Sequence, residues 1–377
     1  MNYMTIRILI VLFLLAGLIG FGSAYVVHEQ KAEPVMQAET IVPTTGPEET
    51  VPETTFPIET TLPETEPQPE HFVISFAGDC TLGSDANTYG SSDSFVGMVG
   101  ENYSYPFQNV KHYFANDDLT LVNLEGVFCD WGEILDPESI FNFRGPESYI
   151  NILTEGYIDW VHLANNHTMD YGLRALNITK ELLDEAGIGY ADKNSSVLVE
   201  TESGLKVGIY SAQFNVYVDD IKQEAAQLRE QGAEIVIASI HWGGEGKYKP
   251  FAHQVKKAHA VIDAGVDLIF GHHPHVLQPV EYYNDGIICY SLGNFSFGGN
   301  HRPSDLDSAI LQLEVIRDVD GAVSMGALTV IPVCCSSTQP WNNFQPTPYE
   351  EDSEEYARVL SKLDGSWKGG NIRVYYS

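Results

Sequence analysis

The sequence has few basic residues and few cysteines, and both shortages narrow the classes of protein to which it can belong. Lysine and arginine number 20 against 52 aspartate and glutamate residues, which gives a net charge of −32. Such an acidic surface argues against nucleic acid as a partner, and an anionic substrate would need local positive charge, which metal ions supply. The five cysteines contain no Cys-x-x-Cys pair, so neither a disulfide scaffold nor a sulfur-rich zinc site is expected, although one disulfide remains open.

A long uncharged, apolar stretch runs from Ile8 to Val27. A helix of about 20 residues spans the roughly 30 Å of hydrocarbon in a bilayer. Arg7 precedes the stretch, so the positive-inside rule predicts a cytoplasmic N-terminus. We expect residues 1–29 to form a cytoplasmic start and a transmembrane signal anchor, with the rest of a single-pass cell-membrane protein outside the cytoplasm. Small residues at 22–24 leave a cleaved signal peptide, and secretion, as the alternative.

Residues 30–70 consist mainly of proline, threonine and glutamate, as in PEETVPETTFPIETTLPETEP. Such a segment has little to bury, its carboxylates repel one another and its prolines favour extended backbone. We therefore predict a disordered, stiffened stalk between the anchor and a folded domain at residues 71–345. Residues 346–377 form an acidic C-terminal segment, with a helix-like pattern at 350–363.

Beyond residue 71, short apolar runs alternate with helical patterns. The predicted strands are residues 72–77, 119–122, 159–164, 206–211, 234–240, 267–270 and 286–291, followed by a pair at 308–316 and 322–333. The predicted helices are residues 172–186, about 219–231, and about 250–263 with Pro250 in the first turn. This alternation favours an α/β fold with buried, parallel or mixed strands.

Polar residues that commonly bind metals stand at the ends of five of these strands. They are Asp79, Glu125, Asn166, His167, His241, His273 and His275. The functional crevice of an open α/β sheet lies beyond the carboxyl ends of its strands. A single polar residue there usually caps a helix or makes a turn, but so many together indicate a common site.

Carboxylate, amide and imidazole groups in one place favour one or two divalent ions such as Mn, Fe, Zn or Co. Two ions that share a carboxylate polarise a phosphoryl oxygen and deprotonate a water molecule. The pair His273 and His275 is the most specific local signal, because an extended backbone would put both imidazoles on one side. His162 is expected in the core, and His253 and His259 on a helix surface, while His272 is not expected to bind metal directly.

The motifs of this region resemble those of the CapA family of bacterial poly-γ-glutamate capsule synthesis, whose domain is similar to calcineurin-like metallophosphatases. In chain order they are FAGDCTLG, NLEGVF, FRGPES, LANNHTMDYG, HWGGE, GHHPHVLQPVE and YSLGNFSF. The resemblance implies a four-layer sandwich of two mixed β-sheets flanked by helices, and a metal-dependent phosphoric ester hydrolase. Its partners would be an anionic envelope polymer or phosphoester substrate and a membrane polymer synthase complex.

The resemblance also implies a role for each motif residue. Asp79 and His275 would bind a first metal, Asn166, His241 and His273 a second, and Glu125 would bridge the two. His167 would protonate the leaving oxygen with Asp170 orienting it, and Arg144 and Asn294 would contact the substrate.

One departure from the metallophosphatase pattern concerns the first metal. Those enzymes have Asp-x-His where this chain has Asp79-Cys80-Thr81, and Glu125 stands where aspartate is usual. The first metal site is therefore short of one imidazole. Two main functions stay open: a hydrolase, or a non-catalytic factor for assembly or export of a surface polymer. A structural adhesin on a stalk is disfavoured, because it has no need of clustered ligands.

Overall fold

The computed structural model describes residues 67–132 and 140–372. The expected anchor and almost all of the expected stalk lie outside these residues. Among the helices within them, none has the length and apolar character needed to cross a membrane.

The larger sheet has eight strands in the order β17-β16-β15-β1-β3-β6-β7, with β14 paired beside the end of β1. Neighbours among β1, β3, β6, β7 and β14 are parallel, whereas β15 to β17 add antiparallel strands. The strand bounds are β1 Glu70–Thr81, β3 Leu119–Leu124, β6 Trp160–His162, β7 Gly189–Ala191, β14 Asn294–Phe297, β15 Asp307–Arg317, β16 Val323–Cys334 and β17 Thr347–Pro348.

The second sheet has six strands in the order β12-β13-β11-β10-β9-β8, with antiparallel pairing at both edges and parallel pairing between. Its strands are β8 Ser195–Glu200, β9 Lys206–Gln213, β10 Ile235–His241, β11 Leu268–His272, β12 Val280–Tyr283 and β13 Gly286–Cys289. A small third sheet joins β2 Ser84–Asp85, β5 Phe143–Gly145 and β4 Val127–Phe128.

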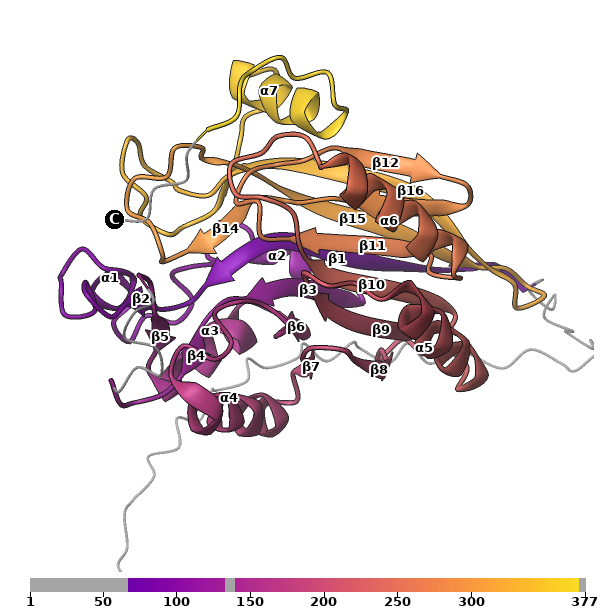
Figure 1. Ribbon diagram of the computed structural model, residues 1–377, viewed down its shortest axis with the longest axis horizontal. Coiled ribbons are helices and arrows are strands. Elements are labelled where there is room, and N and C mark those ends of the chain that lie inside the picture. Colours follow the sequence, from indigo (N-terminus) through magenta and orange to yellow (C-terminus); the bar gives the residue numbers. More distant parts are fainter. Residues whose placement is uncertain (1–66, 133–139, 373–377) are drawn as a thin grey trace, which may run out of the picture. The chain divides into compact units, whose positions relative to one another are not determined.

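The two large sheets pack face to face around one apolar cluster, in which Phe76 of β1 meets Phe270 of β11 with ring centroids 5.1 Å apart. Helices cover the outer face of each sheet (Figure 1). On the larger sheet they are α1 Phe95–Val99, α2 Lys111–Phe114, α3 Ile150–Glu155 and α4 Gly172–Ala186, and on the second α5 Val218–Glu230 and α6 Ala252–Asp263. The predicted α/β arrangement of two mixed sheets with helices outside is confirmed.

Most predicted elements are present, with informative differences at their ends. Helix α4 has the predicted bounds because Gly187, at φ +72°, adopts the left-handed conformation that ends it. Strand β1 continues beyond its predicted end at Ala77, because it pairs with β14 through Asp79 and Thr81. Pro250 precedes α6 instead of standing in its first turn, since the helix begins at Ala252. Strands β8 and β12 were not predicted, because these half-buried edge strands lack a long apolar run.

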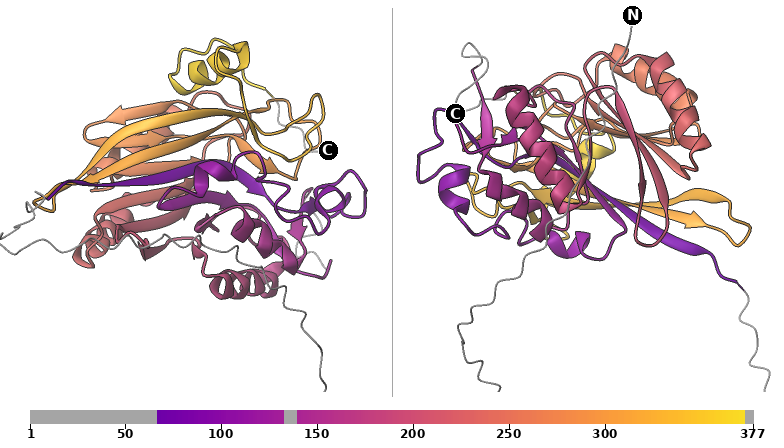
Figure 2. Two further views of the ribbon diagram at one scale, coloured as in Figure 1. Left: turned by 180° about the vertical axis from the view of Figure 1, so that it is seen from behind. Right: turned by 90° about the horizontal axis from the view of Figure 1, so that it is seen from below.

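The predicted strand pair near the C-terminus forms the long antiparallel hairpin β15–β16, which runs beside β1 (Figure 2). Helix α7, Glu354–Leu363, packs on this hairpin, and its Val359 and Leu363 join the core between the sheets. Two positively charged side chains of the same helix form ion pairs with Asp307, since Arg358 Nε and Lys362 Nζ each lie 2.7 Å from Asp307 Oδ2.

This buried ion cluster should make stability depend on acidity. Burial alone would raise the pKa of Asp307, but hydrogen bonds from Arg358 and the charge of Lys362 outweigh it and hold that pKa below its ordinary value. A carboxyl whose pKa is lowered by folding stabilises the protein above its unfolded pKa, and the contribution is lost as the pH falls through the folded pKa.

We expect Asp307→Asn to lower the free energy of unfolding by about 3 kcal/mol at neutral pH, because it removes one partner of buried Lys362. The difference from the unaltered chain should shrink below pH 3.8, the ordinary pKa of an aspartate. Denaturant titrations at several pH values measure it. Asp320→Asn, in the exposed β15–β16 turn, makes the same charge change and should cost less than about 0.5 kcal/mol. Equal losses in the two variants would contradict the assignment.

Candidate metal centre

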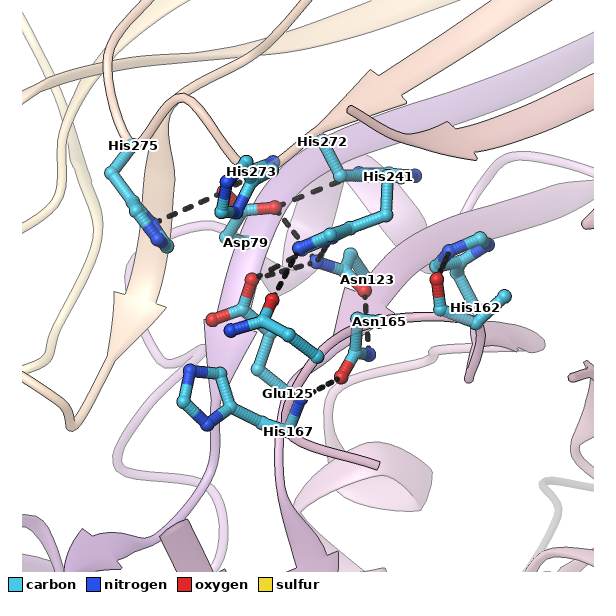
Figure 3. A network of polar contacts seen from close by, with 12 residues as sticks. Asp79, Asn123, Glu125, His162, Asn165, His167, His241, His272, His273 and His275 are labelled. Atoms are coloured by element: carbon cyan, nitrogen blue, oxygen red, sulfur yellow. Dashed lines mark hydrogen bonds and ion pairs between the residues drawn. The ribbon is translucent and has the colours of Figure 1, made fainter. Parts of the chain in front are cut away.

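The carboxyl ends of strands from both sheets meet at one edge of the sandwich. Asp79 of β1 is in register with Asn123 of β3, and in the other sheet His241 of β10 is in register with His272 of β11. Figure 3 shows the side chains of Asp79, Glu125, His241 and their neighbours pointing toward one another across this edge.

Asn123 connects the two acidic residues of the cluster. Its Nδ2 lies 2.8 Å from Asp79 Oδ1 and 3.1 Å from Glu125 Oε1, so one amide donates to both carboxyl groups. Asn165 holds this amide in place, with its own Nδ2 3.1 Å from Asn123 Oδ1 and 2.7 Å from the carbonyl oxygen of Leu124. Neither asparagine was predicted as a site residue, although Asn123 lies two positions before Glu125, a spacing that puts both side chains on one face of an extended strand.

The two carboxyl groups are almost completely removed from water, with Asp79 1% and Glu125 2% exposed. Burial raises the pKa of Asp79, and burial together with the charge of Asp79 raises the pKa of Glu125 well above its ordinary value. Within the described residues, Glu125 Oε2 has no hydrogen-bond partner. Buried, mutually repelling carboxylates with an unsatisfied oxygen favour a cation between them.

The imidazoles of the cluster are held neutral. Burial lowers the pKa of His241 well below its ordinary value, and lowers the pKa of His273 and of His275 to about 4 each. A neutral imidazole is the form that binds metal ions. Nδ1 of His273 makes no hydrogen bond within the part of the chain that the structure describes.

His273 and His275 come from a bend and not from the extended backbone expected from the sequence. Strand β11 ends at His272, and His273 and His275 have φ angles of +96° and +53°. Their ring centroids lie 5.8 Å apart, so a left-handed backbone brings the imidazoles together. Positive φ at non-glycine residues costs about 1–3 kcal/mol each and is concentrated at functional sites.

Among the described residues, two groups of side chains have ligand atoms within 4.8 Å of one another. The first joins Asp79, Glu125 and His275, which are the residues expected around the first metal. The second joins Glu245, His273 and His275, and Glu245 was not expected to take part.

The residues expected around the second metal also lie side by side. Nε2 of His241 is 2.7 Å from Asn166 Oδ1, and the His241 ring centroid is 4.6 Å from that of His273. Oxygen and imidazole donors therefore face one another on the side of Glu125 toward the second sheet.

His167 and Asp170 form the expected pair. His167 Nδ1 lies 3.0 Å from Asp170 Oδ2, which also accepts the backbone N–H of Phe143 at 2.7 Å. The ring of Phe143 packs against the imidazole with centroids 4.5 Å apart. Both partners are buried, and burial raises the pKa of Asp170.

The two residues expected to contact substrate have other neighbours. The Arg144 guanidinium donates to the carbonyl oxygen of Cys129 at 3.1 Å and stacks 3.6 Å above the Tyr89 ring. Side chains alternate along a strand, so Arg144 points to the side of β5 opposite Phe143 and His167. Asn294 Oδ1 lies 2.8 Å from His275 Nδ1, where it helps to orient the imidazole, and the same nitrogen lies 3.4 Å from Asp79 Oδ2.

The remaining histidines and cysteines follow the sequence expectations. His162 is buried beside Ser211, 3.1 Å from Nδ1 to Oγ, and His259 pairs with Glu281 at 2.8 Å on α6. His272 supports the cluster from behind, with Nε2 2.9 Å from Ser239 Oγ. All five cysteines fall within the described residues and are free and buried, so the disulfide left open by the sequence is not formed.

The fold and the site together define an α/β protein with a candidate metal centre at the shared edge of two mixed sheets. The model of the bacterial capsule synthesis protein family PGA_cap matches residues 73–299, and the chain belongs to that family. The resemblance to CapA indicated by the motifs is thereby confirmed.

The chain is also similar to proteins of known name and to solved structures. The chain is 28% identical to the capsule biosynthesis protein CapA of Bacillus anthracis, over 78% of this chain and 74% of the relative. It is 26% identical to the PGA biosynthesis protein CapA of Bacillus subtilis, over 77% of each. Among solved structures, the NAD nucleotidase of Haemophilus influenzae is 13% identical, with a TM-score of 0.39 over 80% of this chain and 63% of that one.

We expect divalent metal to raise the thermal unfolding temperature of the full-length chain, because a ligand that binds only the folded state stabilises it by mass action. Asp79→Asn should remove most of the increase seen with Mn²⁺, since it neutralises a buried ligand. Thermal scans with and without metal measure the effect. An increase of equal size in Asp79→Asn and the unaltered chain would argue against this site.

Proposed function

We propose that the protein is a metal-dependent phosphoesterase that acts in the synthesis of a capsule or other envelope polymer. The observation that carries the proposal is the convergence of two buried carboxyl groups and three neutral imidazoles beside the His167–Asp170 pair. Carboxylate, amide and imidazole donors around one point are suited to borderline divalent ions such as Mn, Fe, Zn or Co.

The residues present fit one or two such ions. Asp79, Glu125 and His275 would hold the first ion, and Asn166, His241 and His273 would hold the second, with Glu125 shared. Glu125 Oε2 and His273 Nδ1, which have no hydrogen-bond partner among the described residues, are atoms that an ion could use as ligands. A bound divalent ion supplies Lewis-acid polarisation of a phosphoryl oxygen and lowers the pKa of water.

The acid of the reaction would be His167. Its Nδ1 is engaged by Asp170, so Nε2 is the nitrogen that can give a proton to the departing oxygen. The second acceptor contact of Asp170, from the Phe143 N–H, fixes the carboxyl group and thereby the direction of the imidazole. The acidic residue of a catalytic triad orients its histidine in the same way.

We further propose that residues 1–29 anchor the protein in the cell membrane, with the domain outside the cytoplasm. The uncharged stretch from Ile8 to Val27 and the stalk-like composition of residues 30–70 support this. The partners would then be an anionic envelope polymer or a phosphoester substrate and a membrane polymer synthase complex. Recovery of the full-length chain in the soluble fraction of cells would contradict the anchor.

We expect Mn²⁺, Zn²⁺, Fe²⁺ or Co²⁺ to support release of nitrophenol from nitrophenyl phosphate esters by the full-length chain. His273→Ala should lower kcat/KM by at least about 100-fold, because it removes a metal-binding imidazole. His253→Ala is the matched control, since His253 is exposed on α6 and should leave the rate unchanged. Absence of turnover with all four metals near neutral pH would contradict the proposed reaction.

A second candidate function is that of a non-catalytic factor for polymer assembly or export, and it is favoured by Thr81. This residue stands where metallophosphatases place an imidazole, and it is fully buried with no hydrogen-bond partner for Oγ1 among the described residues. A cluster short of one imidazole would suit binding of a metal or polymer without turnover.

The amount of surface polymer on cells that express variants of the protein distinguishes the two functions. If the protein is a phosphoesterase, His167→Ala should reduce surface polymer about as much as deletion of residues 71–345 does, because the acid is needed for each turnover. If it is a non-catalytic factor, polymer should persist in His167→Ala cells and disappear only on deletion. The measurement is the amount of surface polymer in a deletion strain complemented with each variant at equal protein level.

A further inference from the structure

Glu245 lies beside the metal-type histidines although it belongs to a different loop. It follows β10 in the HWGGE motif, and its carboxylate, with one nitrogen each of His273 and His275, forms a group within 4.8 Å. Its side chain is exposed, whereas both histidines are buried. Glu245 therefore stands at the solvent side of the cluster.

The loop that carries Glu245 is fixed by contacts on both sides of that residue. Gly243 and Gly246 have φ angles of +93° and +67°, so the chain turns sharply before and after it. The Gly246 N–H donates to the carbonyl oxygen of Pro274 at 2.8 Å, which ties the loop directly to the bend between His273 and His275.

The C-terminal segment closes over the same loop. The N–H of Ile372 donates to the Gly246 carbonyl oxygen at 3.1 Å, and Asn371 Oδ1 accepts the Tyr248 N–H at 3.2 Å. A Cβ at Gly246 would lie 2.2 Å from the Ile372 carbonyl oxygen, so only glycine permits this approach. The position of Glu245 is thus set by two segments far from it in the sequence.

The alternative is that Glu245 is an ordinary surface residue on a glycine-rich turn, with no functional role. Two observations oppose it. The carboxylate of Glu245 lies within 4.8 Å of a nitrogen of His273 and of His275, and its loop is tied to the bend that carries both histidines. His273, nine-tenths buried, also has its Nδ1 unpartnered within the described residues.

We propose that Glu245 is a further metal ligand, which binds an ion together with His273 and His275 and adds a third carboxylate to the centre. It would compensate for Thr81, which stands where metallophosphatases have an imidazole. The inference concerns metal binding and needs no assumption about the reaction.

Replacement of an imidazole by a carboxylate changes which ion the centre prefers. Carboxylate oxygen is a harder donor than imidazole nitrogen and favours Mn²⁺ and Mg²⁺ over softer ions. Glu245 would also add a carboxylate to a cluster that is linked to Asp79 and Glu125 through the shared residue His275. We therefore expect the centre to bind Mn²⁺.

The test is binding of Mn²⁺ to the full-length chain in detergent, followed by loss of the electron paramagnetic resonance signal of the free ion. Glu245→Gln should raise the dissociation constant for Mn²⁺ at least about tenfold, because even loss of a group that only supports a metal ligand lowers metal affinity by about that factor. Glu230→Gln, at the exposed end of α5, removes the same charge far from the cluster and should change it less than about twofold.

The visible spectrum of the Co²⁺-loaded chain separates direct binding from an effect of charge. Glu245→Gln should alter the d–d bands, since these report the donor set and geometry of the ion. Weaker affinity with an unchanged spectrum would show that Glu245 acts only through its charge, and would overturn the inference. Equal Mn²⁺ affinity of the Glu245→Gln and Glu230→Gln variants would also overturn the inference.

Different experimental results would contradict the ligand assignment of Glu245 and the proposed reaction. If His275→Ala abolishes binding while Glu245→Gln leaves affinity and spectrum unchanged, Glu245 is not a ligand but the metal centre stands. If Glu245→Gln behaves as expected and no ester is hydrolysed, the ligand assignment holds and the reaction is wrong. A chain that binds neither ion would overturn the inference.

Discussion

The burial of Asp79 and Glu125 beside one another is the constraint on which the surrounding structure depends. Removing a charged carboxylate from water costs several kcal/mol unless partners replace the lost solvation, and two together also repel. Asn123 donates to both, Asn165 holds Asn123, and His275 lies within 3.4 Å of Asp79. A cation held by both carboxyl groups would offset their repulsion, so the cluster is a candidate metal centre.

Both sheets are needed to build this cluster. The larger sheet supplies the acids from β1 and from the end of β3, and the second sheet supplies the imidazoles from the ends of β10 and β11. The core between the sheets, with Phe76 against Phe270, therefore determines how acids and imidazoles face one another. Helix α7 contributes to the same core through Val359 and Leu363, so a C-terminal element far from the site helps to maintain its geometry.

The chain belongs to the capsule synthesis family although Thr81 stands where metallophosphatases have a metal-binding histidine. The two facts are compatible if the metal-binding atoms can come from different positions in the chain. A metal ion requires a number of suitable atoms at suitable distances, and different chain segments can supply them. The loop after β10, held to Pro274 by a hydrogen bond from Gly246, brings Glu245 to the histidines. A loss on β1 can thus be balanced by a gain on another strand end.

The types of secondary-structure element and the chemical character of the site could be predicted from the amino-acid sequence. Helix α4 and its end at Gly187 follow from periodicity and a local backbone preference, and the types of donor follow from the residues at the strand ends. Which metal-binding groups lie together depends on the three-dimensional fold. Asn123 connects Asp79 to Glu125, Asn294 orients His275, Arg144 stacks on Tyr89 and Glu245 approaches His273, through contacts between different elements of the chain. Local preferences act over a few residues, whereas convergence depends on strand pairing and backbone bends that no local pattern encodes, such as the left-handed turn at His273 and His275.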